Sequence, residues 1–146
     1  MSQGQSPNIM RRNALEPRSV LFLFRPNGTG TVTDIYDPLD AVASITRTGV
    51  GTFAVVMQPG VAQQSATGNN STWTNGAALA VRPDMRTSLA SMGFKCHAAQ
   101  VGGPTYDSAG RLTFTLVVVD SANAAADTSN VANVVQCTVE WDDARQ

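Results

Sequence analysis

Charged side chains are scarce in this chain: Asp, Glu, Lys and Arg make up 14% of its 146 residues, against about a quarter in an ordinary soluble domain. The formal net charge is −1, so no basic field gathers phosphates, and we expect no nucleic-acid partner. The exterior must consist largely of Ser, Thr, Asn, Gln, Gly and Ala, which cost less free energy to desolvate than Lys or Glu. Such a surface favours contact with other proteins, with an ordinary low-charge soluble domain as the alternative.

Long apolar runs are absent. No segment approaches the roughly 20 apolar residues of a membrane span, and the N-terminal stretch MSQGQSPNIMRRNALEPRS lacks the apolar run of a signal peptide. We therefore expect no membrane partner, and synthesis and retention in a cytoplasm until the protein is incorporated into an assembly.

Cysteine and histidine are too few for a metal centre. Cys96 and Cys137 have no CxxC spacing and no His-rich neighbours, so they predict two buried small side chains rather than zinc ligands. A disulfide between them is the less favoured alternative. The single histidine, His97, could be drawn as a dyad with Cys137, but a lone histidine on a strand is far more often structural or exposed.

The acidic residues form no recognised site. Two groups stand out by position, but neither has the spacing or the glycine of a calcium-binding loop, and solvated turn carboxylates are the better interpretation: Asp34, Asp37 and Asp40, and Glu140, Asp142 and Asp143. A glycosidase pair of carboxylates stays formally open. No nucleotide-binding loop or hydrolase motif occurs. We expect no enzyme activity, no catalytic residue, no metal and no cofactor.

Short apolar or alternating runs recur at intervals of roughly 10 residues with turn signals between them. This pattern predicts an all-β fold, an antiparallel β-sandwich or jelly roll of about seven or eight strands. A chain of this length fits one domain, which we assign to residues 19–146. Residues 1–18 show no periodicity and contain two prolines, so they predict a flexible, extended N-terminal arm.

Three segments carry the clearest strand signals. Residues 41–57 predict a hairpin that turns at Thr48–Gly51, where glycines tolerate positive φ. Residues 112–119 predict a central strand because their far end is apolar on both faces. The last strand alternates, with Val135, Cys137, Val139 and Trp141 facing inward.

A further strand is predicted to end at Pro83, followed by a single helical turn that Asp84 or Thr87 would cap.

Candidate partner contacts are segments with exposed apolar residues, or strands with apolar residues on both faces. Val20–Phe24 is apolar on both faces, which predicts cover by a second sheet and by a neighbouring protein. The polar loop 59–75 contains Trp73, which either packs on its own core or anchors a partner. With the two arginines of the arm, the predicted interface residues are Arg11, Arg12, Phe22, Phe24 and Trp73.

Two segments carry a resemblance. SITRTGVGTFAVVM at 44–57 resembles a hairpin signature of small virion proteins of tailed bacteriophages, V-T-R-T-G-x-G-x-Y/F-x-V. LTFTLVVVDSANAAADTSNVANVVQCTVEW at 112–141 is similar to the end of the same proteins: a strand, an Ala/Asp loop and a final alternating strand. The resemblance implies a structural role in a virion, most like a head decoration or cement protein that binds the major capsid protein at the head surface.

Other readings stay open. Tail, collar and fibre proteins use similar β-modules, so the place in the virion is a weaker expectation than the class. Because closed symmetric oligomers dominate, the protein is expected to associate with itself as a dimer or trimer. A carbohydrate- or receptor-binding jelly roll would use Trp73 and Tyr106 as stacking platforms, and a small esterase or glycosidase would depend on His97.

Overall fold

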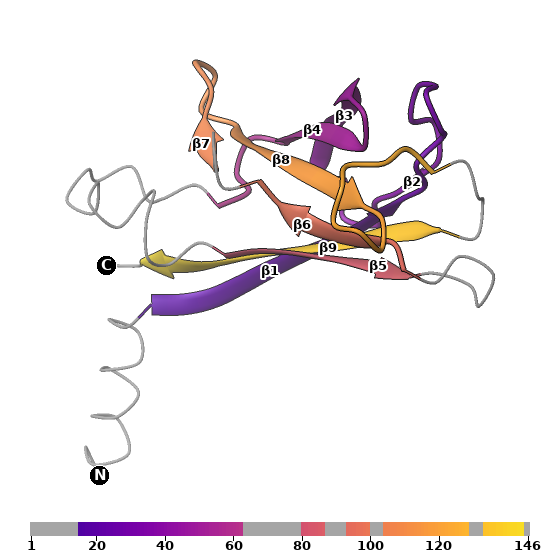
Figure 1. Cartoon of the computed structure of the whole chain (residues 1–146). Helices are drawn as coiled ribbons and strands as arrows, with labels where there is room; N and C mark the ends of the chain where they lie inside the picture. Colours follow the sequence, from indigo (N-terminus) through magenta and orange to yellow (C-terminus); the bar gives the residue numbers. More distant parts are fainter. Residues whose placement is uncertain (1–14, 63–79, 87–92, 100–103, 129–132, 145–146) are drawn as a thin grey trace, which may run out of the picture.

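The computed structural model describes residues 15–62, 80–86, 93–99, 104–128 and 133–144 (Figure 1). Over these ranges the protein is all-β, and its strands form two antiparallel sheets, as predicted. Sheet A has the order β2 (Ile35–Tyr36), β1 (Leu15–Phe24), β9 (Val134–Ala144) and β5 (Ala80–Arg86). Sheet B has the order β3 (Val42–Gly49), β4 (Thr52–Met57), β8 (Leu112–Val119) and β6 (Lys95–Ala98), and β7 (Thr105–Tyr106) also pairs with β8.

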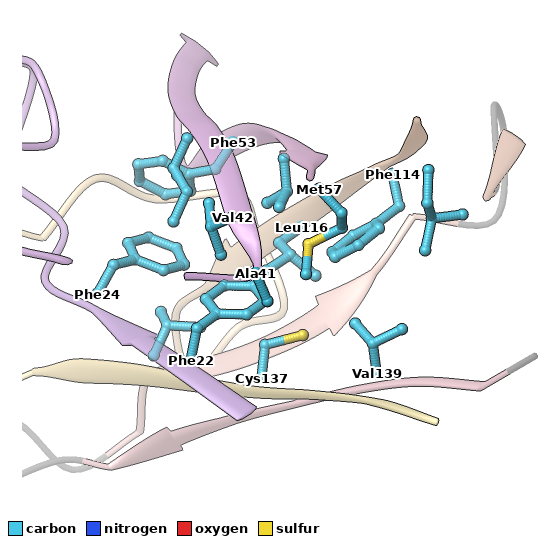
Figure 2. Packing of buried hydrophobic residues seen from close by; sticks show 14 of the residues in the cluster. Phe22, Phe24, Ala41, Val42, Phe53, Met57, Phe114, Leu116, Cys137 and Val139 are labelled. Atoms are coloured by element: carbon cyan, nitrogen blue, oxygen red, sulfur yellow. The ribbon is translucent and has the colours of Figure 1, made fainter. Parts of the chain in front are cut away.

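The two sheets pack face to face around one hydrophobic core, as in a β-sandwich. Their inward faces follow the period of two that a strand imposes, so that alternate residues of β4, β8 and β9 are buried. Phe24 of sheet A meets Phe53 of sheet B edge-to-face, with ring centroids 5.2 Å apart. Figure 2 shows side chains of both sheets pointing toward one another. Each fully buried Phe, Leu or Val contributes about 1.5–3 kcal/mol.

Several strand predictions are confirmed. The hairpin turns at Val50 and Gly51, between β3 and β4. β8 lies centrally, with partners on both sides. In β9, Val135, Cys137 and Val139 are fully buried, and Trp141 packs against the core.

Two boundaries differ from the sequence prediction. Residues 15–18, assigned to the arm, instead begin β1, because β9 extends far enough to pair with them. Pro83 does not end β5, which continues through Asp84 to Arg86 in register with β9, so the predicted helical turn does not begin at Asp84. β5 is the end strand of sheet A, where a missing N–H can face away from the neighbour. Thr87 and residues 1–14 lie outside the described residues.

Three loops share one geometry built on an aspartate. The backbone carbonyl of Asp37, Asp107 or Asp120 accepts the N–H of the third residue that follows, at 3.1, 2.9 and 3.0 Å. The aspartate carboxylate accepts the N–H of the fourth. The third residue has positive φ in each loop: Asp40 (51°), Gly110 (78°) and Asn123 (61°). Asp37 is therefore a turn-capping residue rather than a merely solvated carboxylate.

Candidate docking face

The outer face of sheet B over β3, β4 and β8 is made of small uncharged side chains. The inward residues of β4 and β8 are buried, so the residues between them point outward, and the register places Thr52 beside Val117, Ala54 beside Thr115 and Val56 beside Thr113. β3 continues this surface with Ser44 beside Val56 and Thr46 beside Ala54. We call these eight residues the Thr/Val face: Ser44, Thr46, Thr52, Ala54, Val56, Thr113, Thr115 and Val117.

Charge is absent from the Thr/Val face and lies at its borders, at Lys95 of β6 and at Arg111 directly before β8. Lys95 and His97 of β6 are exposed and stand opposite Val119 and Val117 in the register. Removal of a hydroxyl from water costs far less than removal of an ammonium or carboxylate, and removal of a methyl group is favourable. An uncharged centre with charge at its edge is the composition of a protein interface core and rim.

The outer face of sheet A differs. Arg82 forms an ion pair with Glu140 across β5 and β9, with 3.2 Å between Nε and Oε2, and Asp84 and Arg86 are also exposed on this face. The two outer faces of one sandwich therefore carry different chemistry, since the ion pair and its charged neighbours belong to sheet A. The Thr/Val face is therefore less costly to desolvate than the charged β5–β9 side of sheet A.

A side-chain clamp holds the hairpin that forms part of this face. The Arg47 guanidinium donates to both carboxylate oxygens of Asp127, at 3.0 Å from Nε and 2.6 Å from Nη2, and the Gly51 N–H donates to Oδ1 at 2.8 Å. The hydrogen bond between Arg47 and Asp127 raises the pKa of the arginine. The same contact lowers the pKa of Asp127, partial desolvation opposes that shift, and the Gly51 N–H adds to it.

Gly51 is required for this close approach. Its φ is +60°, and a Cβ added there would lie 2.5 Å from the Val118 carbonyl oxygen and 2.7 Å from backbone atoms of Ala126. The glycine therefore lets the hairpin turn contact the 120–128 loop. Arg47 and Gly51 of segment 44–57 thus meet Asp127 of segment 112–141 at this clamp.

The residue after Asp127 ties in two more segments. The Thr128 carbonyl accepts the Gly28 N–H at 2.9 Å, and its Oγ1 accepts from Nδ2 of buried Asn133 at 2.6 Å. The β1–β2 connection, the β3–β4 hairpin and the start of β9 are thereby fixed to one another at the same end of the sandwich.

Compared with known proteins, the chain matches no family model, no curated protein and no solved structure.

The predicted interface residues lie elsewhere. Phe22 and Phe24 are 0% and 1% exposed, so both belong to the core and the prediction that they contact a partner is wrong. β1 is apolar on both faces because its outward residues are leucines as well: Leu21 is exposed and Leu23 is half-buried. Arg11, Arg12 and Trp73 lie outside the described residues. The alternation of Thr, Ala and Val along β4 and β8 was the available signal for the Thr/Val face.

Residues considered for other chemistry are dispersed. His97 is exposed on the outer face of sheet B, whereas Cys137 is buried between the sheets, so they form no dyad. Cys96 and Cys137 are free thiols, and burial raises the pKa of each to about 12. The Tyr106 hydroxyl donates to the Ala62 carbonyl at 2.6 Å, and the half-buried ring packs on the core, so it is not an open stacking platform.

The described ranges hold neither a candidate metal centre nor a candidate membrane-spanning helix. No group of three or more His, Cys, Asp or Glu side chains there is arranged to hold a metal ion. Those ranges also contain no helix long and apolar enough to cross a membrane.

Proposed function

We propose that this protein is a non-enzymatic structural component of a tailed-bacteriophage virion, which docks through the Thr/Val face on the major capsid protein and stabilises the head as a decoration or cement protein. The observation that carries the proposal is the absence of charge from the Thr/Val face on β3, β4 and β8, in contrast to the ion pair on the outer face of sheet A. The resemblance of the hairpin and of the C-terminal segment supports the virion class.

The mechanism is mass action on a lattice. A capsid opens at the seams between subunits, and a protein bound across a seam adds its binding free energy to the cost of opening. A face of Thr, Ser, Ala and Val loses less solvation free energy on contact than a charged face does, so less packing is needed to offset that loss. Copies repeated over the lattice sum these small contributions.

The test uses expanded heads that lack the protein. The purified full chain should co-sediment with them and raise their melting temperature. Thr115→Glu should weaken binding by at least about tenfold, which corresponds to about 1.4 kcal/mol, because the contact would bury an unpaired carboxylate.

The matched control is Thr138→Glu, the same substitution on the outer face of sheet A, where Arg82 stands opposite the new carboxylate. It should bind heads like the wild type. Equal weakening by both variants, or a wild-type protein that ignores heads, would overturn the proposal. Sedimentation with isolated tails instead would move the protein to the tail, collar or fibre and overturn its place on the head.

A further inference from the structure

Exposed apolar side chains gather at one edge of sheet A. Among the described residues, the exposed large hydrophobics are Leu21, Ile35, Tyr36, Leu39 and Val50. All except Val50 lie on β1, on β2 or in the loop after β2, and Tyr36 and Leu39 are 62% and 64% exposed. Monomeric proteins rarely leave such side chains grouped without a function. We call this group, together with half-buried Leu23 and Val134, the β2 patch.

The β2 patch contains a recess as well as protruding side chains. A pocket of about 250 Å³ is lined by Leu23, Phe24, Arg25, Asp34, Tyr36 and Val134. Leu23 pairs with Tyr36 in the register, and both point to the outer face of sheet A. For comparison, an apolar cavity of about 150 Å³ accommodates benzene, so the recess has room for an aromatic ring.

Among the described residues, β2 pairs with β1 alone and no strand lies on its far side. The Arg25 N–H donates to the Asp34 carbonyl at 3.0 Å, which makes these two residues a hydrogen-bonded pair. In an antiparallel ladder the next pair, Phe24 with Ile35, is non-hydrogen-bonded. The Ile35 N–H and C=O therefore point away from β1, and β2 is the end strand of sheet A.

We infer that the β2 patch binds a second copy of this chain. The two β2 strands pair antiparallel about a two-fold axis at Ile35, so that Ile35 faces its counterpart and Tyr36 of each copy stands opposite Asp34 of the other. Asp34 lines the recess, so each Tyr36 ring covers the recess of the other copy. The two four-stranded sheets then continue into one another edge to edge.

Self-complementarity is the reason for this choice of partner. An isologous interface must present both a protrusion and the recess that receives it, and Tyr36 and its neighbouring pocket do so within one patch. The charges match in the same way: Arg25 and Asp34 form an ion pair of 2.7 Å whose side chains are 49% and 60% exposed. The pair leaves the patch without net charge, so two copies meet without repulsion and a strongly charged partner gains nothing.

The dimer goes beyond the proposed docking on capsids and does not depend on it. The β2 patch belongs to the edge of sheet A, whereas the Thr/Val face belongs to sheet B. A dimer carries two Thr/Val faces, and linked faces bind a repeating lattice with greater avidity than single ones.

The test is sedimentation velocity of the full chain from dilute solution to the highest soluble concentration. The wild type should reach twice the 15.4 kDa chain mass. Tyr36→Glu, which places a carboxylate in the recess, and Ile35→Pro, which removes the edge N–H, should each raise the dimer Kd at least about tenfold. Val50→Glu is the matched control, since Val50 is 54% exposed but outside the patch, and it should dimerise like the wild type.

Thermal melts check that each variant is folded, and Tyr36→Ala provides a milder substitution if Ile35→Pro does not fold. A wild type that stays monomeric, a trimer, or a Tyr36→Glu variant that dimerises with unchanged Kd would overturn the inference. None of these outcomes bears on head binding by the Thr/Val face, which is measured separately with expanded heads. Failure of the dimer inference is therefore distinguishable from failure of the proposed function.

Discussion

Arg47 and Asp127, 80 residues apart in the sequence, form a two-pronged ion pair with both side chains about four-fifths shielded from solvent. Arg47 belongs to the hairpin and Asp127 to the loop after β8, so the pair joins two segments that have no local reason to meet. The Gly51 N–H occupies a further site on the same carboxylate. Side-chain contacts therefore fix the hairpin to the 120–128 loop. The hairpin itself is held by the pairing of β3 with β4.

Acid should weaken this clamp. The pKa of Asp127 in the folded protein lies below the ordinary value of 3.8, chiefly because Arg47 donates to it. The ion pair therefore stabilises the fold at pH above the unfolded-state value, and this contribution is lost as the pH falls through the lower folded-state pKa. Asp127→Asn should lower the melting temperature at pH 7 and lose less on acidification than the wild type.

Melting curves at a series of pH values check this. Asp34→Asn is the control, because its ion pair is more than half exposed on the Asp34 side and such pairs contribute little. Melting temperatures of Asp127→Asn and wild type that run parallel down to pH 2 would contradict the expectation.

The two glycines of the hairpin signature should respond differently to alanine. At Gly51 a Cβ would overlap backbone atoms of Val118 and Ala126, and φ is +60°, so Gly51→Ala should cost at least about 2 kcal/mol. At Gly49 the only neighbour of a Cβ is Thr52 at 3.9 Å, so Gly49→Ala should be nearly neutral. Urea unfolding of both variants measures the difference in the free energy of unfolding. Equal losses would show that the turn conformation, and not the contact with the 120–128 loop, requires glycine.

The aspartate-capped loops offer stabilising substitutions. Asn123 has a φ of 61° and Asp40 a φ of 51°, while the equivalent residue of the third loop is already Gly110. Glycine adopts this conformation without steric cost, although it gives the unfolded chain more freedom. Because strain in the left-handed region costs about 1 kcal/mol or more, Asp40→Gly should be neutral or raise the free energy of unfolding by up to about 1 kcal/mol.

Asn123→Val should lose about 1–2 kcal/mol, since a β-branched residue tolerates positive φ worst. Thermal or urea unfolding ranks the variants. An Asn123→Val protein as stable as the wild type would contradict the loop geometry.

Neighbouring residues of β1 should separate packing from surface contact. Phe22 is fully buried, so Phe22→Ala should cost about 3–5 kcal/mol. Leu21 is 36% exposed on the opposite face, so Leu21→Ala should cost clearly less. Urea unfolding measures both, and a Phe22→Ala protein of wild-type stability would mean that Phe22 is not a core residue.

Both thiols should resist labelling in the native protein. Burial raises the pKa of Cys96 and Cys137 to about 12, and the thiolate is the reactive form. A chromogenic disulfide reagent at pH 8 should therefore react slowly with the folded protein and rapidly with both thiols in denaturant. Immediate reaction of both thiols without denaturant would contradict their burial in the folded protein.

Local sequence pattern was enough to predict the all-β class, the hairpin turn and the facing of β9, because a strand alternates its side chains with a period of two and turns need residues that tolerate positive φ. It could not decide which face of β1 is buried, since Phe22 and Phe24 alternate with Leu21 and Leu23 and both sets are apolar. It also missed the course of β5 through Pro83, which depends on that strand lying at a sheet edge.

The tertiary structure decided the rest. The Thr/Val face exists only because β3, β4 and β8 align their outward residues, and β8 is far from the hairpin in sequence. The clamp of Arg47 and Asp127 likewise spans 80 residues. Strand order and register are set by the packing of the whole core, and no local window of sequence contains that information.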